Sequence, residues 1–302
     1  MKFRTALLIF LIGALVSGCR TASSPAAGAN GSGQFDPHDL SGTWARFGTR
    51  EGRGVNQGGA PFPEAGDTGF GRDVPPLTPE GQKMFDAAKP GNGRILNSAD
   101  AAAHPDEPIG RRRAVAEKLQ NDPTGQCTPS GLTRMILTTY FAPMEIIQTK
   151  DRVIEHFEWT TDQRTIFTDG RQLPKEPELL RWNGFSVGRW EGDTFIVNSN
   201  GFQENTWLDQ FGYPHSDQMQ LEERYRRLSP DRLELIMTVT DPKVYMKPFV
   251  SQRKVFRLLS KEETTIEEGW NDLLDNRCVP SEEFFFNEKI RNPAGGKVFA
   301  AK

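Results

Sequence analysis

The residues best suited to acid–base chemistry are one histidine and two glutamates, His215, Glu223 and Glu158. His215 stands in a loop between two predicted strands, and an imidazole titrates close to neutral pH, so it can serve as a general acid or base. Alternation along residues 221–227 places Glu223 on one strand face with Tyr225. An inward-facing carboxylate must be paired or have a raised pKa. We therefore predict that His215 and one of the two glutamates form an acid–base pair that works without a cofactor.

Each of these residues also has a structural interpretation. His215 can hydrogen-bond its loop to the neighbouring sheet instead of handling substrate protons. Glu223 or Glu158 can belong to a ladder of arginine–glutamate pairs across strands, with Arg164 or Arg224 as the partner. The sequence leaves both interpretations open.

An arginine and several aromatic residues predict a binding site for a small molecule. In Asp169-Gly170-Arg171, the aspartate can accept backbone N–H groups and the glycine can take a positive φ, so Arg171 projects from a turn. Arg171 can hold a ligand carboxylate through two hydrogen bonds or can fix a neighbouring loop. The aromatic side chains that can wall a cavity, or simply fill the core, are Trp182, Trp190, Trp207, Tyr225 and Tyr245.

Several classes of function lack their sequence signatures. The chain contains no P-loop and no dinucleotide-binding fingerprint. The string Gly184-Phe185-Ser186-Val187-Gly188 matches Gly-x-Ser-x-Gly, but it lies inside a predicted strand and not at a strand-to-helix turn, so it is not a nucleophile elbow. The chain also lacks Cys-x-x-Cys and His-Glu-x-x-His motifs, so we predict neither a metal nor a cofactor. The formal net charge of −3 argues against a basic nucleic-acid surface. Oligomeric state is left without a prediction.

Short alternating segments between turn residues dominate the region 126–280. Gly192 lies in the turn of the clearest predicted hairpin. Consecutive strands with short turns predict an antiparallel meander, and so many strands tend to close into a barrel that leaves no free edges. The predicted strands cover residues 134–140, 144–149, 153–159, 164–168, 184–190, 194–199, 219–227, 232–241, 250–259 and 264–268.

The region 39–125, here called the strap, is rich in glycine and proline and is predicted to be irregular with one or two short helices. Thr78 and Pro79 are typical of a helix start, which predicts a helix through residue 89. Further short helices are predicted over residues 111–120 and 270–274, and residues 281–302 form a tail. Residues 39–302 are therefore predicted to be a single β-rich domain.

The first residues are typical of an export signal. A basic start precedes an apolar run that is too short to cross a bilayer. The sequence Val-Ser-Gly-Cys ending at Cys19 resembles the lipobox of bacterial lipoproteins, which implies cleavage after residue 18 and a lipid on Cys19. Residues 19–38 are then a flexible tether. Because Arg20 and not aspartate follows the cysteine, we expect the protein on the periplasmic face of the outer membrane.

Two cysteines remain once Cys19 carries a lipid, Cys127 and Cys278. An even pair in an oxidising compartment predicts one structural disulfide that closes most of the mature chain.

Two resemblances support this interpretation. Gly42-Thr43-Trp44 resembles the Gly-x-Trp opening of lipocalins and related calycin barrels, so the expected fold is mainly β and lipocalin-like. A second resemblance rests on motifs within residues 127–248. These are Cys-x-Pro-x-Gly from Cys127, Asp-Gly-Arg from Asp169, Ser-Val-Gly-Arg-Trp-Glu-Gly-Asp-Thr from Ser186, Gly201-Phe202, Trp-Leu-Asp from Trp207, His215-Ser216, Glu-Arg-Tyr-Arg-Arg from Glu223, and Asp241-Pro242 with Tyr245 and Pro248. In combination they resemble a large family of exported, β-rich acidobacterial and proteobacterial proteins, mostly uncharacterised. Membership implies secretion but no established catalytic residues, and the chain departs from the common pattern after residue 248.

Three functions are compatible with these features. The first is a lipid-attached envelope protein that binds a small apolar or aromatic ligand in a barrel cavity. The second is a cofactor-independent hydratase, lyase or isomerase that uses His215 with an inward carboxylate. The third is a purely structural role in the envelope.

Overall fold

The computed structural model describes residues 35–46, 48, 65–66, 68–93, 114–116, 119–266, 270–271, 273 and 278–279. The predicted signal peptide (residues 1–18), Cys19, most of the tether and the tail (residues 281–302) lie outside the described residues.

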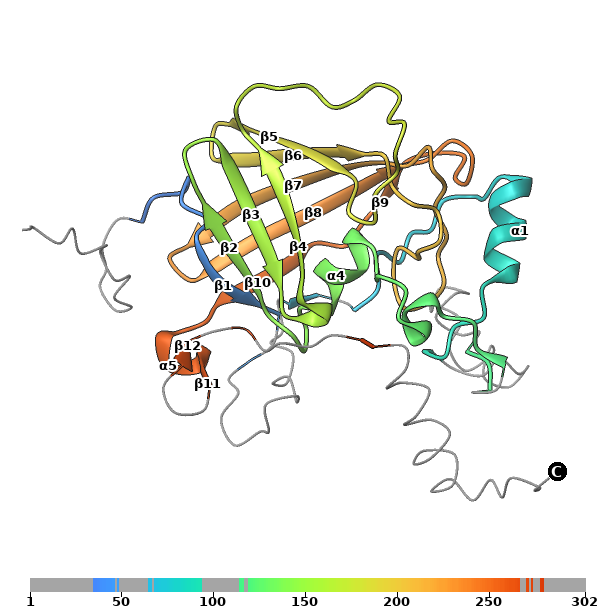
Figure 1. Cartoon of the computed structure of the whole chain (residues 1–302), viewed down its shortest axis with the longest axis horizontal. Coiled ribbons are helices and arrows are strands. Elements are labelled where there is room, and N and C mark those ends of the chain that lie inside the picture. Colours follow the sequence, from blue (N-terminus) through green and yellow to red (C-terminus); the bar gives the residue numbers. More distant parts are fainter. Residues whose placement is uncertain are drawn as a thin grey trace, which may run out of the picture. The chain divides into compact units, whose positions relative to one another are not determined.

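A ten-stranded sheet forms the centre of the described chain (Figure 1). Strands β1 to β9 pair in chain order, and β10 closes a barrel because it pairs with both β1 and β8. The predicted mainly β, lipocalin-like barrel with short helices is confirmed. The strands are β1 (Gly42–Ala45), β2 (Met144–Gln148), β3 (Arg152–Phe157), β4 (Asp162–Phe167), β5 (Phe185–Glu191), β6 (Thr194–Asn200), β7 (Gln220–Ser229), β8 (Arg232–Thr240), β9 (Phe249–Val250) and β10 (Lys254–Leu258).

Alternation of side chains sets the inner face of the barrel. On β7, Leu221, Glu223 and Tyr225 are buried, while Arg224 and Arg226 are exposed, as the sequence pattern predicts. The inward apolar residues of the strands belong to one continuous hydrophobic cluster. The interior of the barrel is therefore a packed core, with a few charged groups set into it.

Local turn chemistry is also as predicted. Strands β5 and β6 form a hairpin in which Glu191 pairs with Thr194, and Gly192 takes a φ of +56° in the two-residue turn. A side chain at that φ is strained, which explains the glycine. The predicted antiparallel meander needs one correction. Strands β4 and β5 pair in parallel, because a long loop and not a tight turn connects them, whereas the other pairings in the barrel are antiparallel.

The strap contributes helix α1 (Pro79–Ala87), which begins where the sequence predicts. Thr78 caps it by accepting a hydrogen bond from the Gly81 N–H at 2.9 Å. Before the helix, the strap contacts the barrel through buried polar groups. Lys254 donates to the Gly69 carbonyl at 2.7 Å, and the Phe70 N–H donates to the buried Asp209 carboxylate at 2.8 Å. These buried polar contacts hold the strap against the barrel.

The first strand carries the fully buried Trp44. Its indole N–H donates to the Leu40 carbonyl at 2.9 Å, and the Arg227 guanidinium lies 5.4 Å from the ring centroid. The tryptophan of the Gly-x-Trp motif therefore packs under an arginine of β7.

The prediction of a strand over residues 134–140 is wrong. Helix α4 (Leu132–Thr138) occupies this position, and it follows a short 3-10 helix, η3 (Pro123–Gln126). Every residue of α4 is buried. A helix that is buried all round has no polar stripe, so its sequence shows no helical period, and its isoleucine and threonines resemble a strand.

Three predictions near the ends of the barrel also need correction. The segment 111–120 is only partly described, and Ala114–Ala116 there lie in no helix; Val115 instead donates to the Pro90 carbonyl at 2.9 Å. Of the strand predicted over residues 264–268, Thr264 ends helix α5 (Lys261–Thr264), and residues 265–266 form β11 (Thr265–Ile266), which pairs with β12 (Trp270–Asn271) in a small separate sheet and not in the barrel. Of the helix predicted over residues 270–274, the described residues 270–271 form a strand instead, and residues 272 and 274 lie outside the described residues.

Candidate functional site

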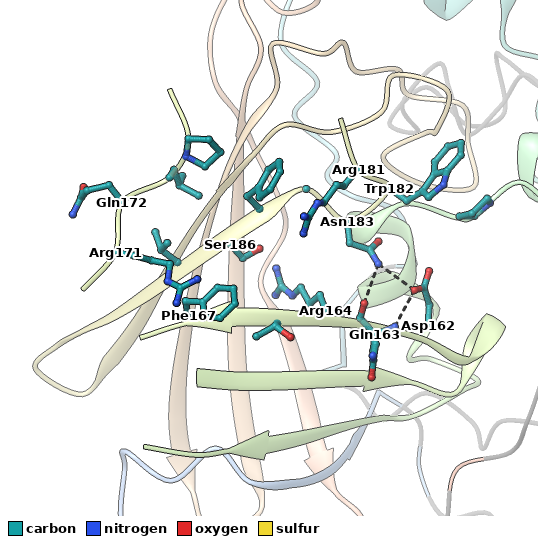
Figure 2. Close-up of a pocket in the computed structure, with 17 residues that line it drawn as sticks. Asp162, Gln163, Arg164, Phe167, Arg171, Gln172, Arg181, Trp182, Asn183 and Ser186 are labelled. Atoms are coloured by element: carbon teal, nitrogen blue, oxygen red, sulfur yellow. Dashed lines mark hydrogen bonds between the residues drawn. The ribbon is translucent and has the colours of Figure 1, made fainter. Parts of the chain in front are cut away.

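A pocket of about 680 Å³ lies where β4 meets β5 (Figure 2). Small-molecule sites typically occupy about 300–1,000 Å³. The lining comes from both strands, from Pro129 and from the loop 168–184 that connects the strands. In Figure 1 this yellow-green loop arches over the top of β5 and β6.

The pocket exists because β4 and β5 pair over a short distance. Their parallel register contains Ile166 with Ser186 and Phe167 with Val187. Residues 162–165 of β4 pair with β3 and have no partner strand on the β5 side among the described residues. A parallel connection cannot be a tight hairpin, and the loop 168–184 returns the chain over this gap. The lining residues come from both sides of the gap.

The pocket reaches from the outer to the inner face of the barrel wall. By strand alternation, Phe167 and Phe185 face outward, whereas Arg164 and Ser186 are buried on the inner face. All four line the pocket. Trp182 adds an indole ring from the loop. The outer part is thus walled by aromatic rings, and the inner end is polar.

Arg171 belongs to the turn that the sequence predicts. Gly170 takes a φ of +85°, and the Arg171 N–H donates to the Asp169 carboxylate at 3.2 Å. The guanidinium also pairs with Asp169 at 2.6 Å and stacks on the Phe167 ring at 3.6 Å. Arg171 therefore lines the pocket while its charge is matched within its own turn.

A buried cluster of charged groups lies at the inner end of the pocket. Arg164 donates through Nε to Glu155 at 2.6 Å and through both Nη atoms to Glu223 at 2.7 Å. The Tyr225 hydroxyl donates to Glu223 at 3.0 Å and accepts from Arg164 at 3.3 Å. Side-chain exposure is 2% or less for Arg164 and both glutamates. This is the arginine–glutamate arrangement that the sequence offered as the alternative for Glu223.

The electrostatics of the cluster follow from two carboxylates that share one guanidinium. Burial raises the pKa of Glu223, although Arg164 acts in the opposite direction, and the neighbouring Glu155 raises it further. Burial and both glutamates raise the pKa of the Tyr225 hydroxyl well above its usual value. Burial and the neighbouring carboxylate thus both favour the protonated form of Glu223.

Asp162 and Asn183 form a second polar pair in the pocket wall (Figure 2). The Asn183 amide donates to Asp162 at 3.2 Å and to the Gln163 carbonyl at 3.3 Å. Burial raises the pKa of Asp162. The Asn183 side-chain oxygen is buried and has no hydrogen-bond partner among the described residues. Such an acceptor is suited to an N–H or O–H donor from a ligand or from water.

The hydrogen bonds of His215 are to Thr206 and Ser216 and not to an acidic side chain. Its Nε2 contacts the Thr206 hydroxyl at 2.6 Å, and its Nδ1 contacts the Ser216 carbonyl at 3.2 Å. Ser216 in turn donates to the buried Asp241 through its N–H at 2.6 Å and its hydroxyl at 2.8 Å. The described contacts therefore tie the His215 loop to the end of β8, and they include no hydrogen bond from His215 to Glu223 or Glu158.

His215 should make the unfolding free energy depend on pH. Burial lowers the pKa of its imidazole from 6.5. A base whose pKa is lowered by folding stabilises the protein above the unfolded pKa, and this contribution is lost as the pH falls toward the folded pKa. Urea titrations at several pH values below about 6.5 should show the parent losing stability faster than His215→Gln. If the unfolding free energy changed equally with pH in the two proteins, the pH dependence could not be assigned to His215.

The other residues that the sequence analysis named as site candidates are spread over several parts of the structure. Trp182 also lines a second pocket of about 430 Å³, together with Trp207. Trp190 packs against Phe195 at a centroid distance of 5.1 Å. The buried Tyr245 hydroxyl donates to the Pro214 carbonyl at 2.8 Å. Glu158 is buried immediately after β3, next to the short 3-10 helix η4 (Trp159–Thr161).

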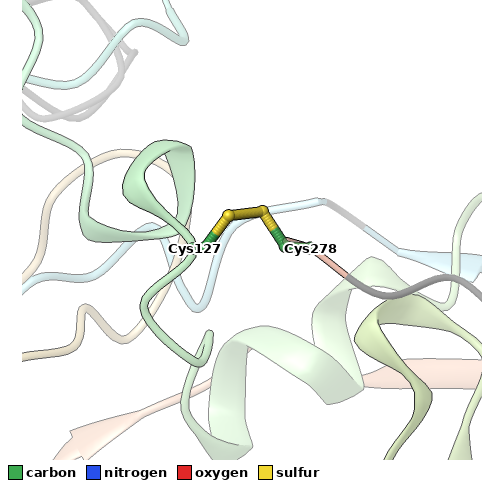
Figure 3. The surroundings of a disulfide bond; sticks show 2 residues. All are labelled: Cys127 and Cys278. Carbon is green, nitrogen blue, oxygen red and sulfur yellow. A yellow bond between two sulfur atoms is a disulfide. The ribbon is translucent and has the colours of Figure 1, made fainter. Parts of the chain in front are cut away.

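The predicted disulfide between Cys127 and Cys278 is present (Figure 3). The Cα atoms are 5.3 Å apart, and 151 positions separate the cysteines in the sequence. Cys127 takes a φ of +58° at the end of η3, just before Pro129 of the pocket lining. The bond therefore fixes the chain that leads into α4 and into one wall of the pocket.

Comparisons with protein-family models, with curated proteins and with solved structures gave no match. Within the described residues, no helix combines the length and the apolar composition that a membrane span requires.

Several pocket residues escaped the sequence analysis. Arg181 and Asn183 are two of them. Each precedes a predicted strand and has an ordinary loop neighbourhood. The signal that could have identified them is the pair of prolines at 174 and 177, because these exclude a tight hairpin between β4 and β5 and require a longer returning segment.

Proposed function

We propose that the protein is a cell-envelope lipoprotein that binds a small apolar or aromatic molecule in the β4–β5 pocket. The observation that carries the proposal is a pocket of about 680 Å³ in the barrel wall, walled by Phe167, Phe185 and Trp182. A few polar groups among aromatic walls are the usual composition of a small-molecule site. Placement in the envelope is supported by the lipobox at Cys19 and by the structural disulfide.

Binding is favoured over catalysis by the state of the candidate catalytic groups. His215 is engaged by Thr206 and Ser216, and Glu223 is engaged by Arg164 and Tyr225. Neither group is free to exchange protons with a molecule in the outer part of the pocket. The chemistry that the site offers is therefore recognition by ring stacking and hydrogen bonds.

Filling the pocket should weaken binding. Thr165 lines it from the outer face of β4, so Thr165→Trp would place an indole in the cavity. We expect affinity for the uncharged fluorescent probe N-phenyl-1-naphthylamine to fall about tenfold or more, which corresponds to about 1.4 kcal/mol. The measurement is probe fluorescence titrated with protein.

Ile147→Trp is the matched control, because Ile147 is exposed on β2 and does not line the pocket. It should bind the probe as the parent does. Both variants should unfold cooperatively, so that loss of binding is not loss of fold. The proposal fails if the parent binds no probe, or if Thr165→Trp binds it unchanged.

A further inference from the structure

Arg181 is held firmly at its backbone beside the pocket. Its N–H donates to the Gly201 carbonyl at 2.9 Å, and its carbonyl accepts from the Gln203 N–H at 3.0 Å. A β-bridge to Phe202 accompanies these bonds. The guanidinium lies 4.2 Å from the centroid of the Phe185 ring, which orients it by a cation–π contact. The position of this charge is therefore set by the end of β6 and by the first residue of β5.

The charge of Arg181 is unmatched among the described residues. Three arginines line the pocket. Arg164 pairs with Glu155 and Glu223, and Arg171 pairs with Asp169. Arg181 is exposed, and within the described residues its guanidinium makes no ion pair and donates no hydrogen bond. Its fork of N–H donors is the geometry that suits a carboxylate.

Asp162 is the competing charge, since it could attract a cation to the same pocket. Its Oδ1 already accepts from the Asn183 amide at 3.2 Å and from the Gln163 N–H at 2.9 Å. Burial also raises its pKa, which weakens the charged form. Asp162 is therefore a poorer partner for a cation than Arg181 is for an anion.

The rings near Arg181 define the rest of the ligand. Phe185 lies under the guanidinium, and Trp182 is the next residue along the chain; both line the pocket. We propose that the ligand is an aromatic carboxylate whose carboxylate group is bound by Arg181 while its ring occupies the aromatic part of the pocket. This inference rests on the proposed binding function and adds the class of ligand.

The test uses three ligands that share one ring and differ in charge: 1-naphthylacetate, 1-naphthylacetamide and 2-(1-naphthyl)ethylamine. Each is titrated against the full-length protein in complex with N-phenyl-1-naphthylamine, and displacement of the probe is measured. We expect the carboxylate to bind about tenfold tighter than the amide at low ionic strength. That preference should shrink at about 500 mM salt, because Arg181 is exposed and is screened.

Arg181→Gln should remove the preference and leave the affinity for the amide unchanged. Arg189→Gln is the control, because Arg189 is an exposed arginine of β5 that pairs with Glu191 and does not line the pocket. It should keep the full preference.

Failure of this inference can be told apart from failure of the binding function. Equal binding of acid and amide, or tighter binding of the amine, would overturn the assignment to Arg181 while probe binding keeps the pocket function intact. The same holds if the probe binds and none of the three ligands displaces it. If the probe itself does not bind, both proposals fall.

Discussion

Replacing Arg164 by methionine is expected to lower the free energy of unfolding by about 3–5 kcal/mol. The change leaves Glu155 and Glu223 buried without the guanidinium that bonds both of them. Removing one member of a buried ionic cluster costs much more than the cluster contributes as a whole, because uncompensated carboxylates remain in a low-dielectric interior. Urea unfolding of parent and variant measures the difference.

The pH dependence of that difference tests the electrostatic reason. The pKa of Glu223 is already raised from 4.5 by burial, and the loss of Arg164 removes the group that lowers it. A carboxyl group whose pKa is raised by folding stabilises the folded protein fully at pH values below its unfolded pKa. This stabilisation is lost as the pH rises through the folded pKa. The gap between variant and parent should therefore narrow as the pH is lowered from about 8 to about 5.

Two further variants separate charge from packing. Replacing Arg164 together with Glu155 and Glu223 by apolar residues should lower the free energy of unfolding far less than the single change does. The reason is that the triple variant leaves no charge of this cluster buried. Arg152→Met removes an exposed pair with Asp151 and should scarcely change stability. A single Arg164 variant as stable as the parent at about pH 8 would show that the cluster does not hold its charges in the folded state.

Removing the disulfide is expected to have a similarly large effect. Cys127 and Cys278 are separated by 151 positions. In the chain-entropy model, a cross-link that closes so long a loop stabilises by about 5 kcal/mol, and measured losses for natural disulfides are about 2–5 kcal/mol. The double variant Cys127→Ser/Cys278→Ser should therefore unfold at a clearly lower urea concentration, as measured by tryptophan fluorescence.

The reduced parent is the matching control, because it lacks the same bond without any substitution. Reduced parent and double variant should unfold at the same urea concentration, while a reducing agent should leave the double variant unchanged. If the double variant matches the oxidised parent, the bond contributes nothing to stability.

The sequence predicts most of the strand pattern because that pattern is local. Alternation on β7 places Glu223 and Tyr225 inward, and the structure confirms it. The turns at Gly170 and Gly192 and the cap at Thr78 also lie where their residue types predict. In each case, a few neighbouring residues carry all of the necessary information.

Helix α4 shows where local information fails. Its burial on every side erases the polar stripe that marks a surface helix. Whether such a segment forms a helix or a strand depends on what surrounds it. Here α4 extends to Thr138, and the buried Arg46 donates to the Leu137 carbonyl at 3.0 Å from beyond β1.

By itself, the sequence determined a β-rich barrel, the inward side of its strands and the cysteine pair, and it offered Arg164 and Arg224 as alternative partners of an inward glutamate. The structure selected Arg164 as the partner of Glu223. Only the tertiary structure decided that β4 and β5 run parallel over a short register, that a pocket opens at their junction, and that Arg181 stands there without an acidic partner among the described residues. The reason is that side-chain alternation is encoded by neighbours in the chain. The match or mismatch of a charge depends instead on which distant segments fold next to it.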